Sequence, residues 1–248
     1  MVNVIIPYIK SEAQGNELLY AIQGWKKHFK YEHQIIVVGD YIDIIPKDVI
    51  YLKYNRTEKD NINYRANLDI IRKLKYAIDK LNLKEFIYTC DDIYAINDFS
   101  LNDIKITKIF EDEMSVIKSS LDCWITDLYK TKECCRKNNL PIKDYVCHLP
   151  VLFNSEKFNY IINKYDCLNN SYVIENLYFN TFIDDNKIYV CDSNYLSIFN
   201  KQSYKYDIDN VLKNKTWIVN SVENWCDELN NILYKHYFDN DINNNSCL

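Results

Sequence analysis

The first 95 residues alternate short apolar runs with helical patterns, and this alternation constrains the fold more than any other feature. Apolar runs bounded by turn residues predict buried strands at residues 2–6, 35–38, 49–52 and from Phe86 onward. Apolar residues at helical spacing predict helices over residues 18–29 and 68–78. The order strand, helix, strand, strand, helix, strand predicts an α/β fold whose mostly parallel sheet has helices on both faces.

The second half is less regular, and we expect it to be a more helical part of the same domain. Helices are predicted over residues 124–135 and 172–182, and two more are predicted to begin at a Ser155 cap and at Ser221. Strands are predicted over residues 114–117, 187–191 and 216–219. No repeat and no Pro/Gly/Ser linker interrupts the chain, which predicts a single domain over residues 1–238. The Asn-rich tail, residues 239–248, is expected to be frayed.

Glycine is scarce, and its scarcity excludes two kinds of nucleotide site. The chain has only Gly15, Gly24 and Gly39. A Walker loop and a GxGxxG fingerprint both need clustered glycines so that the backbone can approach a phosphate closely. If the protein binds a nucleotide, it is therefore expected to do so through side chains and a metal ion.

The charge balance and the apolar runs exclude two further classes. A net charge of −5 has the wrong sign for a protein that grips nucleic acid chiefly through its phosphates. No apolar run reaches the roughly 18 to 20 residues of a membrane span. The start of the chain lacks the basic region of a signal peptide, so a cytoplasmic location is expected.

The nine cysteines are odd in number and form no CxxC pair. A structural zinc site needs closer spacing, often with His. We therefore expect reduced structural thiols, which agrees with a reducing cytosol.

Two adjacent carboxylates, Asp91 and Asp92, follow the apolar run that begins at Phe86. Acidic residues at the carboxyl end of a strand in an open α/β sheet lie at the crevice where ligands bind. Side by side they repel each other unless a cation or a strong donor offsets the charge, and a divalent ion carried by a phosphate-bearing ligand meets that need. An isolated Asp-Asp pair is more often a solvated turn than a binding site. The residues around Asp91 and Asp92 therefore decide which of the two this pair is.

Four pieces in order, Val4–Tyr8, Ile36–Asp40, Arg65–Leu68 and Phe86–Asp92, resemble the nucleotide-sugar-binding half of an A-type (GT-A) glycosyltransferase. The resemblance implies that residues 1–100 bind the nucleotide sugar and 101–238 bind the acceptor. It places the following residues at the nucleotide: Pro7, Tyr8, Asp40, Arg65 and Asn67. It also implies a divalent metal, manganese or magnesium, held on the sugar diphosphate by Asp91 and Asp92.

The sequence departs from this family at Cys90, because the usual cluster is Asp-x-Asp. A thiol is a reluctant ligand for magnesium or manganese. Asp92 is therefore the expected metal ligand, and Asp91 is expected at either the metal or the sugar. The Asp-Asp form, with Glu17–Ala21 and Cys147–Pro150, also resembles the capsular-polysaccharide phosphotransferases and their relatives.

Three candidates in the second half each leave two interpretations open. His148 is either a packed core histidine or a third metal ligand, since a neutral imidazole suits manganese. Glu175 is either an ordinary structural carboxylate or a general base, since it shares a helix face with aromatic residues that would raise its pKa; Asp122 and Asp127 compete for the same role. Lys201 lies in a segment that either closes over a diphosphate or is a solvated loop.

Together these features predict a metal-dependent glycosyltransferase of the hexosyltransferase class. It would move a sugar from a nucleotide-diphosphate donor to a glycan or other hydroxyl acceptor. Glu175 would serve as base only if the reaction inverts the sugar. The alternatives are a sugar-1-phosphate transferase and a non-catalytic binder of nucleotide sugars or glycans.

Overall fold

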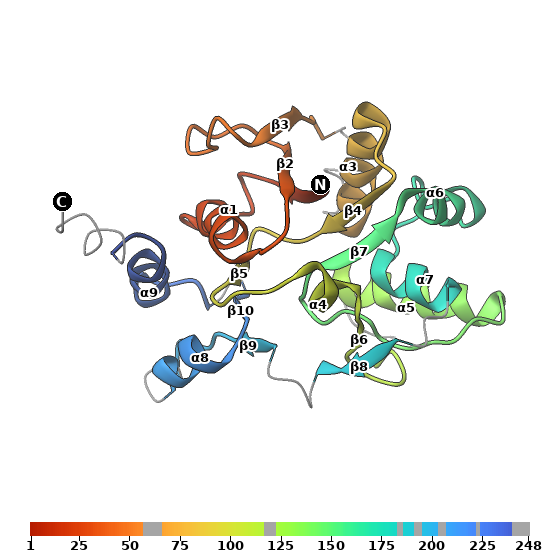
Figure 1. The fold of residues 1–248 in the computed structure, drawn as a ribbon. Helices are drawn as coiled ribbons and strands as arrows, with labels where there is room; N and C mark the ends of the chain where they lie inside the picture. The colour runs from red at the N-terminus through yellow and green to blue at the C-terminus, as the bar shows by residue number, and fades with distance from the viewer. Residues whose placement is uncertain are drawn as a thin grey trace.

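A mostly parallel five-stranded sheet forms the centre of the protein (Figure 1). The computed structural model describes residues 1–56, 66–116, 123–182, 186–190, 195–202, 207–221 and 224–239. The strand order is β3-β2-β1-β4-β7, in which the first four strands run parallel and β7 runs antiparallel to β4. The strands are β1 (Val2–Tyr8), β2 (His33–Gly39), β3 (Ile50–Lys53), β4 (Glu85–Tyr88) and β7 (Val151–Asn154). The predicted α/β class is confirmed.

Helices cover both faces of this sheet because its strands are apolar on both sides. Alternate residues point to opposite faces, so Val4 and Ile6 pack in the core cluster that holds Trp25 of α1 (Glu17–His28). Ile5 of the same strand packs in the other cluster, with Ile71 of α3 (Ala66–Leu81). The two helical patterns read from the sequence are therefore the two sheet-covering helices.

The remaining elements form two small sheets and a set of helices around the central sheet. The small sheets have the orders β5-β10-β9 and β6-β8. Their strands are β5 (Ile93–Ala95), β10 (Trp217–Val219), β9 (Leu196–Ile198), β6 (Thr107–Ile109) and β8 (Lys187–Tyr189). The helices are α4 (Leu101–Lys105), α5 (Cys123–Lys137), α6 (Ser155–Lys164), α7 (Ile174–Thr181), α8 (Ile208–Asn214) and α9 (Asp227–Phe238).

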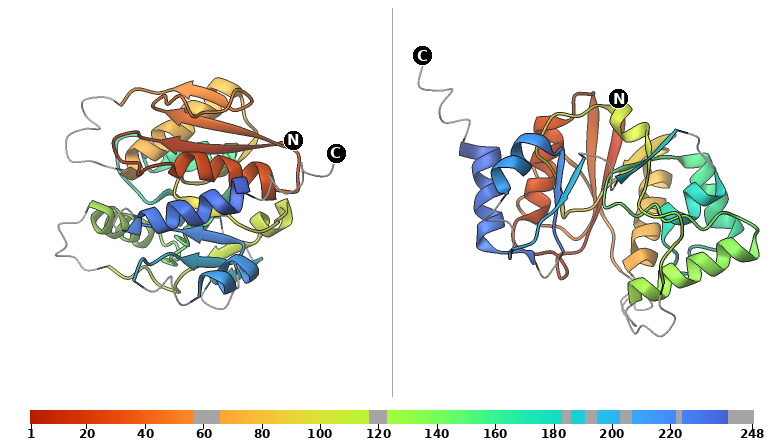
Figure 2. Two further views of the ribbon diagram at one scale, coloured as in Figure 1. Left: turned by 90° about the vertical axis from the view of Figure 1, so that its left-hand side faces the viewer. Right: turned by 90° about the horizontal axis from the view of Figure 1, so that it is seen from below.

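The last helix returns to the first half of the chain. Helix α9 packs beside α1, as both views in Figure 2 show. The Tyr237 hydroxyl of α9 donates to the Ala95 carbonyl at 2.6 Å. Helix α1 reaches the same strand through Gly24, where a methyl group would lie 2.8 Å from the Ala95 nitrogen. Strand β5, directly after Asp91-Asp92, is thus clamped between the first and last helices.

Three sequence predictions were wrong in detail. Residues 114–116 form no strand, and Ile117 lies outside the described residues. The backbone N–H of buried Met114 instead donates to the Ile142 carbonyl, and the Met114 carbonyl accepts a hydrogen bond from the Lys132 ammonium. Ser155 is the first residue of α6 and not its cap, since the Asn154 side chain accepts the Lys157 N–H at 3.0 Å.

The final helix begins at Asp227 rather than at Ser221. The Ser221 carbonyl instead accepts the Asn224 N–H at 2.9 Å, which makes a turn before the helix. The buried face of α9 consists of Leu229, Leu233 and Tyr237, one residue every turn. Beyond Asp239, the Asn-rich tail lies outside the described residues.

The described residues bear on two expectations, one about membrane-spanning segments and one about the cysteines. Within the described ranges, no helix combines the length and apolar character needed to cross a membrane. The seven cysteines in those ranges are all free thiols, as the sequence predicts.

Gly39 ends β2 in a conformation that other residues avoid, with φ at +142°. A methyl group there would lie only 1.9 Å from the Tyr8 carbonyl oxygen. The adjacent Asp40 carboxylate accepts the Lys10 N–H at 2.9 Å. Gly39 therefore lets the ends of β1 and β2 lie close together.

We expect Gly39→Ala to lower the free energy of unfolding by about 2 to 3 kcal/mol, because it adds both backbone strain and a clash with Tyr8. The matched control Asp40→Ala removes one exposed hydrogen bond and should cost about 1 kcal/mol or less. Urea unfolding followed by circular dichroism measures both. Equal losses in the two variants would contradict the proposed role of Gly39.

Candidate functional site

Two cavities open beyond the carboxyl ends of β1 and β4, and they share a wall. The acidic cavity, of about 180 Å³, is lined by Pro7, Glu12, Glu17, Asp69, Asp91 and Asp92, among others. The Trp124 cavity, of about 170 Å³, is lined by residues that include Asn67, Trp124, Tyr145, His148 and Glu175. Both cavities are bordered by Tyr88, Cys90 and Asp92. The stretch that follows β4 thus forms a wall common to the two cavities.

The carboxylates of the acidic cavity perturb one another. Burial raises the pKa of Asp91 well above its ordinary value, and the charges of Asp92 and then Glu17 raise it further. Burial and the Glu17 charge likewise raise the pKa of Asp92. Removal from water and like charge both disfavour ionisation, so this cavity favours a bound cation or a proton.

A buried ion pair lies beneath the acidic cavity. The Lys73 ammonium, 1% exposed, is 2.7 Å from the Asp69 carboxylate and donates to the Tyr8 carbonyl at 2.9 Å. The Arg56 guanidinium also reaches Asp69, at 3.5 Å. The Lys73 charge lowers the pKa of Asp91, opposing the larger effects that raise it. This pair ties α3 to the end of β1 and offsets part of the negative charge.

Glu17 belongs to the site, although the sequence marks it only as part of the Glu17–Ala21 resemblance and not as a candidate. It is buried in the first turn of α1, where it accepts the Gln14 N–H at 2.6 Å and the Asn220 side-chain N–H at 2.9 Å. Asn220 in turn accepts the Tyr94 hydroxyl at 2.5 Å. No local pattern marks Asn220, which follows β10 and comes to the site only through the pairing of β10 with β5.

Glu175 brings the second half of the chain to the Trp124 cavity. It lies in the first turn of α7, and burial raises its pKa to about 7. Asn176, the next residue, receives the Tyr145 N–H on its side-chain oxygen at 2.5 Å and donates to the Asp144 carboxylate at 3.1 Å. Helix α7 therefore holds the segment that carries His148.

His148 adopts a positive φ of 48° beside Glu175 in the lining of the Trp124 cavity. The residue keeps much of its surface accessible, yet the surrounding protein desolvates the imidazole and lowers its pKa, while Asp144 acts in the opposite direction. The lowered pKa favours the neutral imidazole. Trp124, 37% exposed, lies on the α5 side of the same cavity.

Cys90 occupies the place where the resembled family has its first carboxylate. Its thiol lies 3.2 Å from the Tyr88 hydroxyl. Burial raises the pKa of this thiol well above its ordinary value, so the group is neutral at the wall between the two cavities. A neutral thiol adds no charge to a cavity already rich in carboxylates.

The other predicted nucleotide-binding residues lie in different surroundings. Pro7 lines the acidic cavity, whereas Asp40 is exposed at the end of β2 and lines neither cavity described above. Burial, followed by the Asp91 charge, raises the pKa of the Tyr8 phenol to about 12, which places that phenol near the carboxylates. Lys201 is exposed beyond the end of β9, and Arg65 lies outside the described residues.

Asn67 and Asp127, in contrast, hold each other. The Asn67 side chain donates to the Asp127 carboxylate at 3.2 Å, and the Ser171 hydroxyl donates to the same group. Asp127 is only 3% exposed, so it serves to join helices α3 and α5. Of the competing base candidates, Asp122 lies outside the described residues.

The donor atoms of the acidic cavity suit a hard divalent cation. Asp91 and Asp92 offer carboxylate oxygens, the ligands that magnesium and manganese prefer. Across the described parts of the chain, no three His, Cys, Asp or Glu side chains are grouped closely enough to hold a metal by themselves. Magnesium commonly uses one or two carboxylates plus phosphate oxygens and water, so two carboxylates suffice. A ligand role for His148 stays a prediction.

Comparison with known proteins supports the fold. No protein-family model matches the chain, and no curated protein matches it. Among solved structures, mouse xyloside xylosyltransferase 1 aligns with 91% of this chain and 99% of its own, at 8% identity and a TM-score of 0.45. The WbbM bifunctional glycosyltransferase aligns with 96% of this chain at 10% identity and a TM-score of 0.51. The chain spans 50% of that second structure. The likeness to the WbbM structure shows that the protein has a glycosyltransferase fold, as the sequence predicts.

Helix α3 offers a matched test of the buried pair. Lys73→Met would leave Asp69 buried without its ammonium partner, and we expect a loss of about 3 to 5 kcal/mol in the free energy of unfolding. Lys75, on the same helix, pairs with Asp79 at 2.5 Å, where the Asp79 side chain is 57% exposed. Lys75→Met should therefore cost less than about 1 kcal/mol. Similar losses in chemical denaturation would show that the buried pair has no special role.

The raised pKa of Glu175 predicts a pH-dependent effect of Glu175→Gln on stability. Folding favours the protonated acid, so the wild type loses stability as the pH rises from 4.5 towards the folded-state value of about 7. The neutral amide avoids this loss. The variant should therefore gain stability relative to wild type at pH 8 and gain little at pH 5.

Urea denaturation at the two pH values measures this difference. The control Glu156→Gln, at an exposed position in the first turn of α6, should show no comparable change with pH. A stability difference for Glu175→Gln that is the same at both pH values would contradict the raised pKa of this carboxylate.

Proposed function

We propose that the protein is a metal-dependent glycosyltransferase that uses a nucleotide-diphosphate sugar as donor and a hydroxyl group as acceptor. One observation carries the proposal: Asp92 lines both the acidic cavity and the Trp124 cavity. A transferase must hold two substrates on either side of the bond that is exchanged. Two compartments that share one carboxylate wall suit this requirement.

The acidic cavity suits the donor. Its carboxylates would repel a diphosphate, so Asp91 and Asp92 would bind the donor together with a divalent cation. When bound, that cation supplies Lewis-acid stabilisation of the diphosphate as negative charge develops on it. Glu17, held by Asn220, adds negative charge behind the two aspartates and strengthens the attraction for a cation.

The Trp124 cavity suits the acceptor. Trp124 and Tyr145 provide aromatic surface, and Glu175 provides a carboxylate whose pKa of about 7 matches general-base catalysis near neutral pH. In an inverting reaction the acceptor oxygen bonds to the sugar C1 carbon while the bond from C1 to the diphosphate oxygen breaks. Glu175 would take the acceptor proton, and the electron pair would leave with the diphosphate.

The test is donor turnover with and without manganese. Purified protein is screened with nucleotide sugars and a panel of sugar acceptors, and products are followed by phosphorus NMR and mass spectrometry. Asp92→Asn keeps the shape of the side chain but removes its charge, so we expect turnover to fall by about 100-fold or more. The exposed control Asp43→Asn should retain wild-type turnover.

Three outcomes would contradict the proposal. Absence of manganese-dependent binding by any nucleotide sugar would rule out the donor site. Full activity of Asp92→Asn would move the chemistry elsewhere. A product that contains a phosphodiester bond would instead establish the sugar-1-phosphate transferase, in which the metal activates the phosphoryl group.

A further inference from the structure

A larger cavity, of about 630 Å³, lies at the other end of β4. Its lining includes Glu85, the first residue of β4, whereas Asp91 and Asp92 follow the last residue of that strand. Elements α4, β6, β7, α6 and α7, whose places Figure 1 shows, contribute to the lining, together with residues 145–150 before β7. We name it the lysine cavity, after Lys105, Lys108 and Lys157 in its lining. It is separate from the donor compartment proposed above.

The lysine cavity has the opposite charge to the acidic cavity. Three lysines line it against one carboxylate, Glu85. The acidic cavity is lined by five carboxylates, and the chain as a whole carries a net charge of −5. A concave surface lined by one sign of charge concentrates ligands of the opposite sign. In a protein that is acidic overall, this cavity is a local attractor for anions.

Lys108 is the best-fixed of the three cations. Its ammonium donates to the carbonyl oxygens of Asp103 at 2.5 Å and Ile106 at 3.1 Å, beside the end of α4. Burial lowers its pKa to about 8, while Cys147 and Asp103 act in the opposite direction. Its contacts are two carbonyl dipoles and the ring of Tyr195, 5.2 Å away, and no carboxylate is paired with it among the described residues. An anionic ligand would supply that opposite charge.

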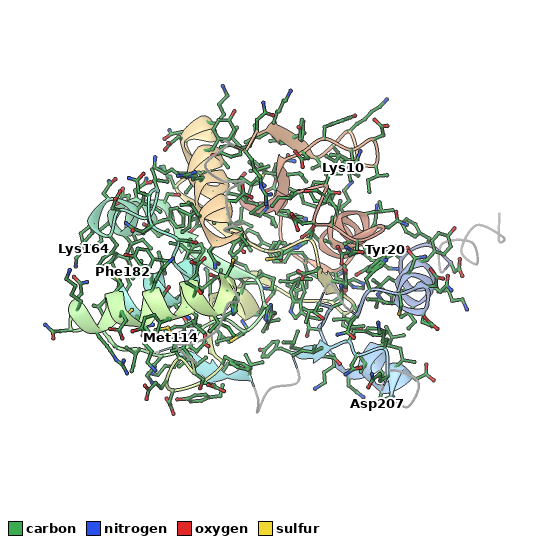
Figure 3. The ribbon with its side chains drawn as sticks, turned by 180° about the vertical axis from the view of Figure 1, so that it is seen from behind. Lys10, Tyr20, Met114, Lys164, Phe182 and Asp207 are labelled. Atoms are coloured by element: carbon green, nitrogen blue, oxygen red, sulfur yellow. The ribbon has the colours of Figure 1, made fainter. Side chains whose placement is uncertain are left out.

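The rest of the lining is apolar and aromatic. Tyr145 and Phe179 are buried in the wall, and Phe182 is half-buried with the Lys157 ammonium 5.1 Å over its ring. Figure 3 shows Phe182 on the opposite side of the molecule from Lys10, which follows β1 at the donor end. The volume falls within the roughly 300 to 1,000 Å³ of small-molecule sites, which combine apolar walls with a few polar groups.

These features together match one class of ligand. A sugar ring offers an apolar C–H face to aromatic walls and hydroxyl groups to polar rims, and a carboxylate or phosphate substituent pairs with lysine. We propose that the lysine cavity is a second saccharide site, which binds a sugar that carries a carboxylate or phosphate group without a metal ion. The proposal does not depend on the proposed transferase activity.

The lysine cavity shares a wall with the Trp124 cavity. Tyr145, Cys147 and Leu149 line both the lysine cavity and the Trp124 cavity. One backbone segment, which also carries His148, thus forms the partition between them. A ligand on one side of this segment contacts the same residues as a ligand on the other side.

The test is a binding titration of the full-length protein in EDTA, so that no divalent cation can recruit anions to the acidic cavity. The probes are glucuronate, glucose 6-phosphate, glucose and inorganic phosphate, measured by calorimetry and by saturation-transfer NMR. The test variant is Lys105→Gln with Lys157→Gln, at two exposed positions. The control is Lys213→Gln with Lys235→Gln, which removes the same charge from exposed positions of α8 and α9.

We expect at least one of the two charged sugars to bind the wild type and the control alike. The test variant should bind it about tenfold more weakly, since two charge contacts are lost. Glucose and inorganic phosphate should each bind more weakly than that charged sugar. Equal binding to the test variant and wild type, failure of both charged sugars to bind at millimolar concentration, or equal binding of inorganic phosphate would each overturn the proposal. Unchanged melting temperatures confirm that both variants are folded.

Discussion

The site depends on the repulsion among carboxylates gathered at the end of β4. Asp91 and Asp92 are half-buried next to Glu17, and burial and like charge raise the pKa of both aspartates. Two contacts hold this cluster together against its repulsion. Lys73 supplies a buried positive charge, and Asn220 fixes Glu17 from the far end of the chain. The repulsion that remains would be relieved by a bound cation, which is the physical basis of the proposed metal site.

The arrangement of the chain around this cluster explains why both halves are needed. Helix α1 places Glu17 beside the carboxyl ends of the central strands. The antiparallel pairing of β10 with β5 places Asn220 next to Glu17. Helix α7 carries Glu175 and, through Asn176, fixes the backbone at Tyr145. That backbone separates the Trp124 cavity from the lysine cavity. Negative charge is thus concentrated at one end of β4 and positive charge at the other.

The sequence predicts the first half of the fold well and the site only in part. Strands that are apolar on both faces and helices with one apolar face have periods that can be read locally, so β1, β2, α1 and α3 follow from the sequence. The place of Asp91 and Asp92 follows from their position after a strand. Short apolar runs are ambiguous, which explains why the strand expected at Met114 is wrong.

The site residues that the sequence does not identify are those whose role depends on contacts with distant parts of the chain. Glu17 has the local pattern of an ordinary acidic residue in the first turn of a helix, and only its contact with Asn220, which is 203 positions away, makes it a site residue. The buried pair of Asp69 and Lys73 has helical i,i+4 spacing, but this spacing is shared by the exposed pair of Lys75 and Asp79. Burial distinguishes them, and burial depends on the whole fold.

We propose that Asp91 and Asp92 hold a divalent cation that is shared with the diphosphate of a sugar donor. The most direct measurement is a crystal structure with manganese and a nucleoside diphosphate, with the metal located by its anomalous scattering. We expect one manganese peak in the acidic cavity, ligated by Asp92 and by diphosphate oxygens. A diphosphate bound elsewhere, or manganese bound without any contact to Asp91 or Asp92, would contradict it.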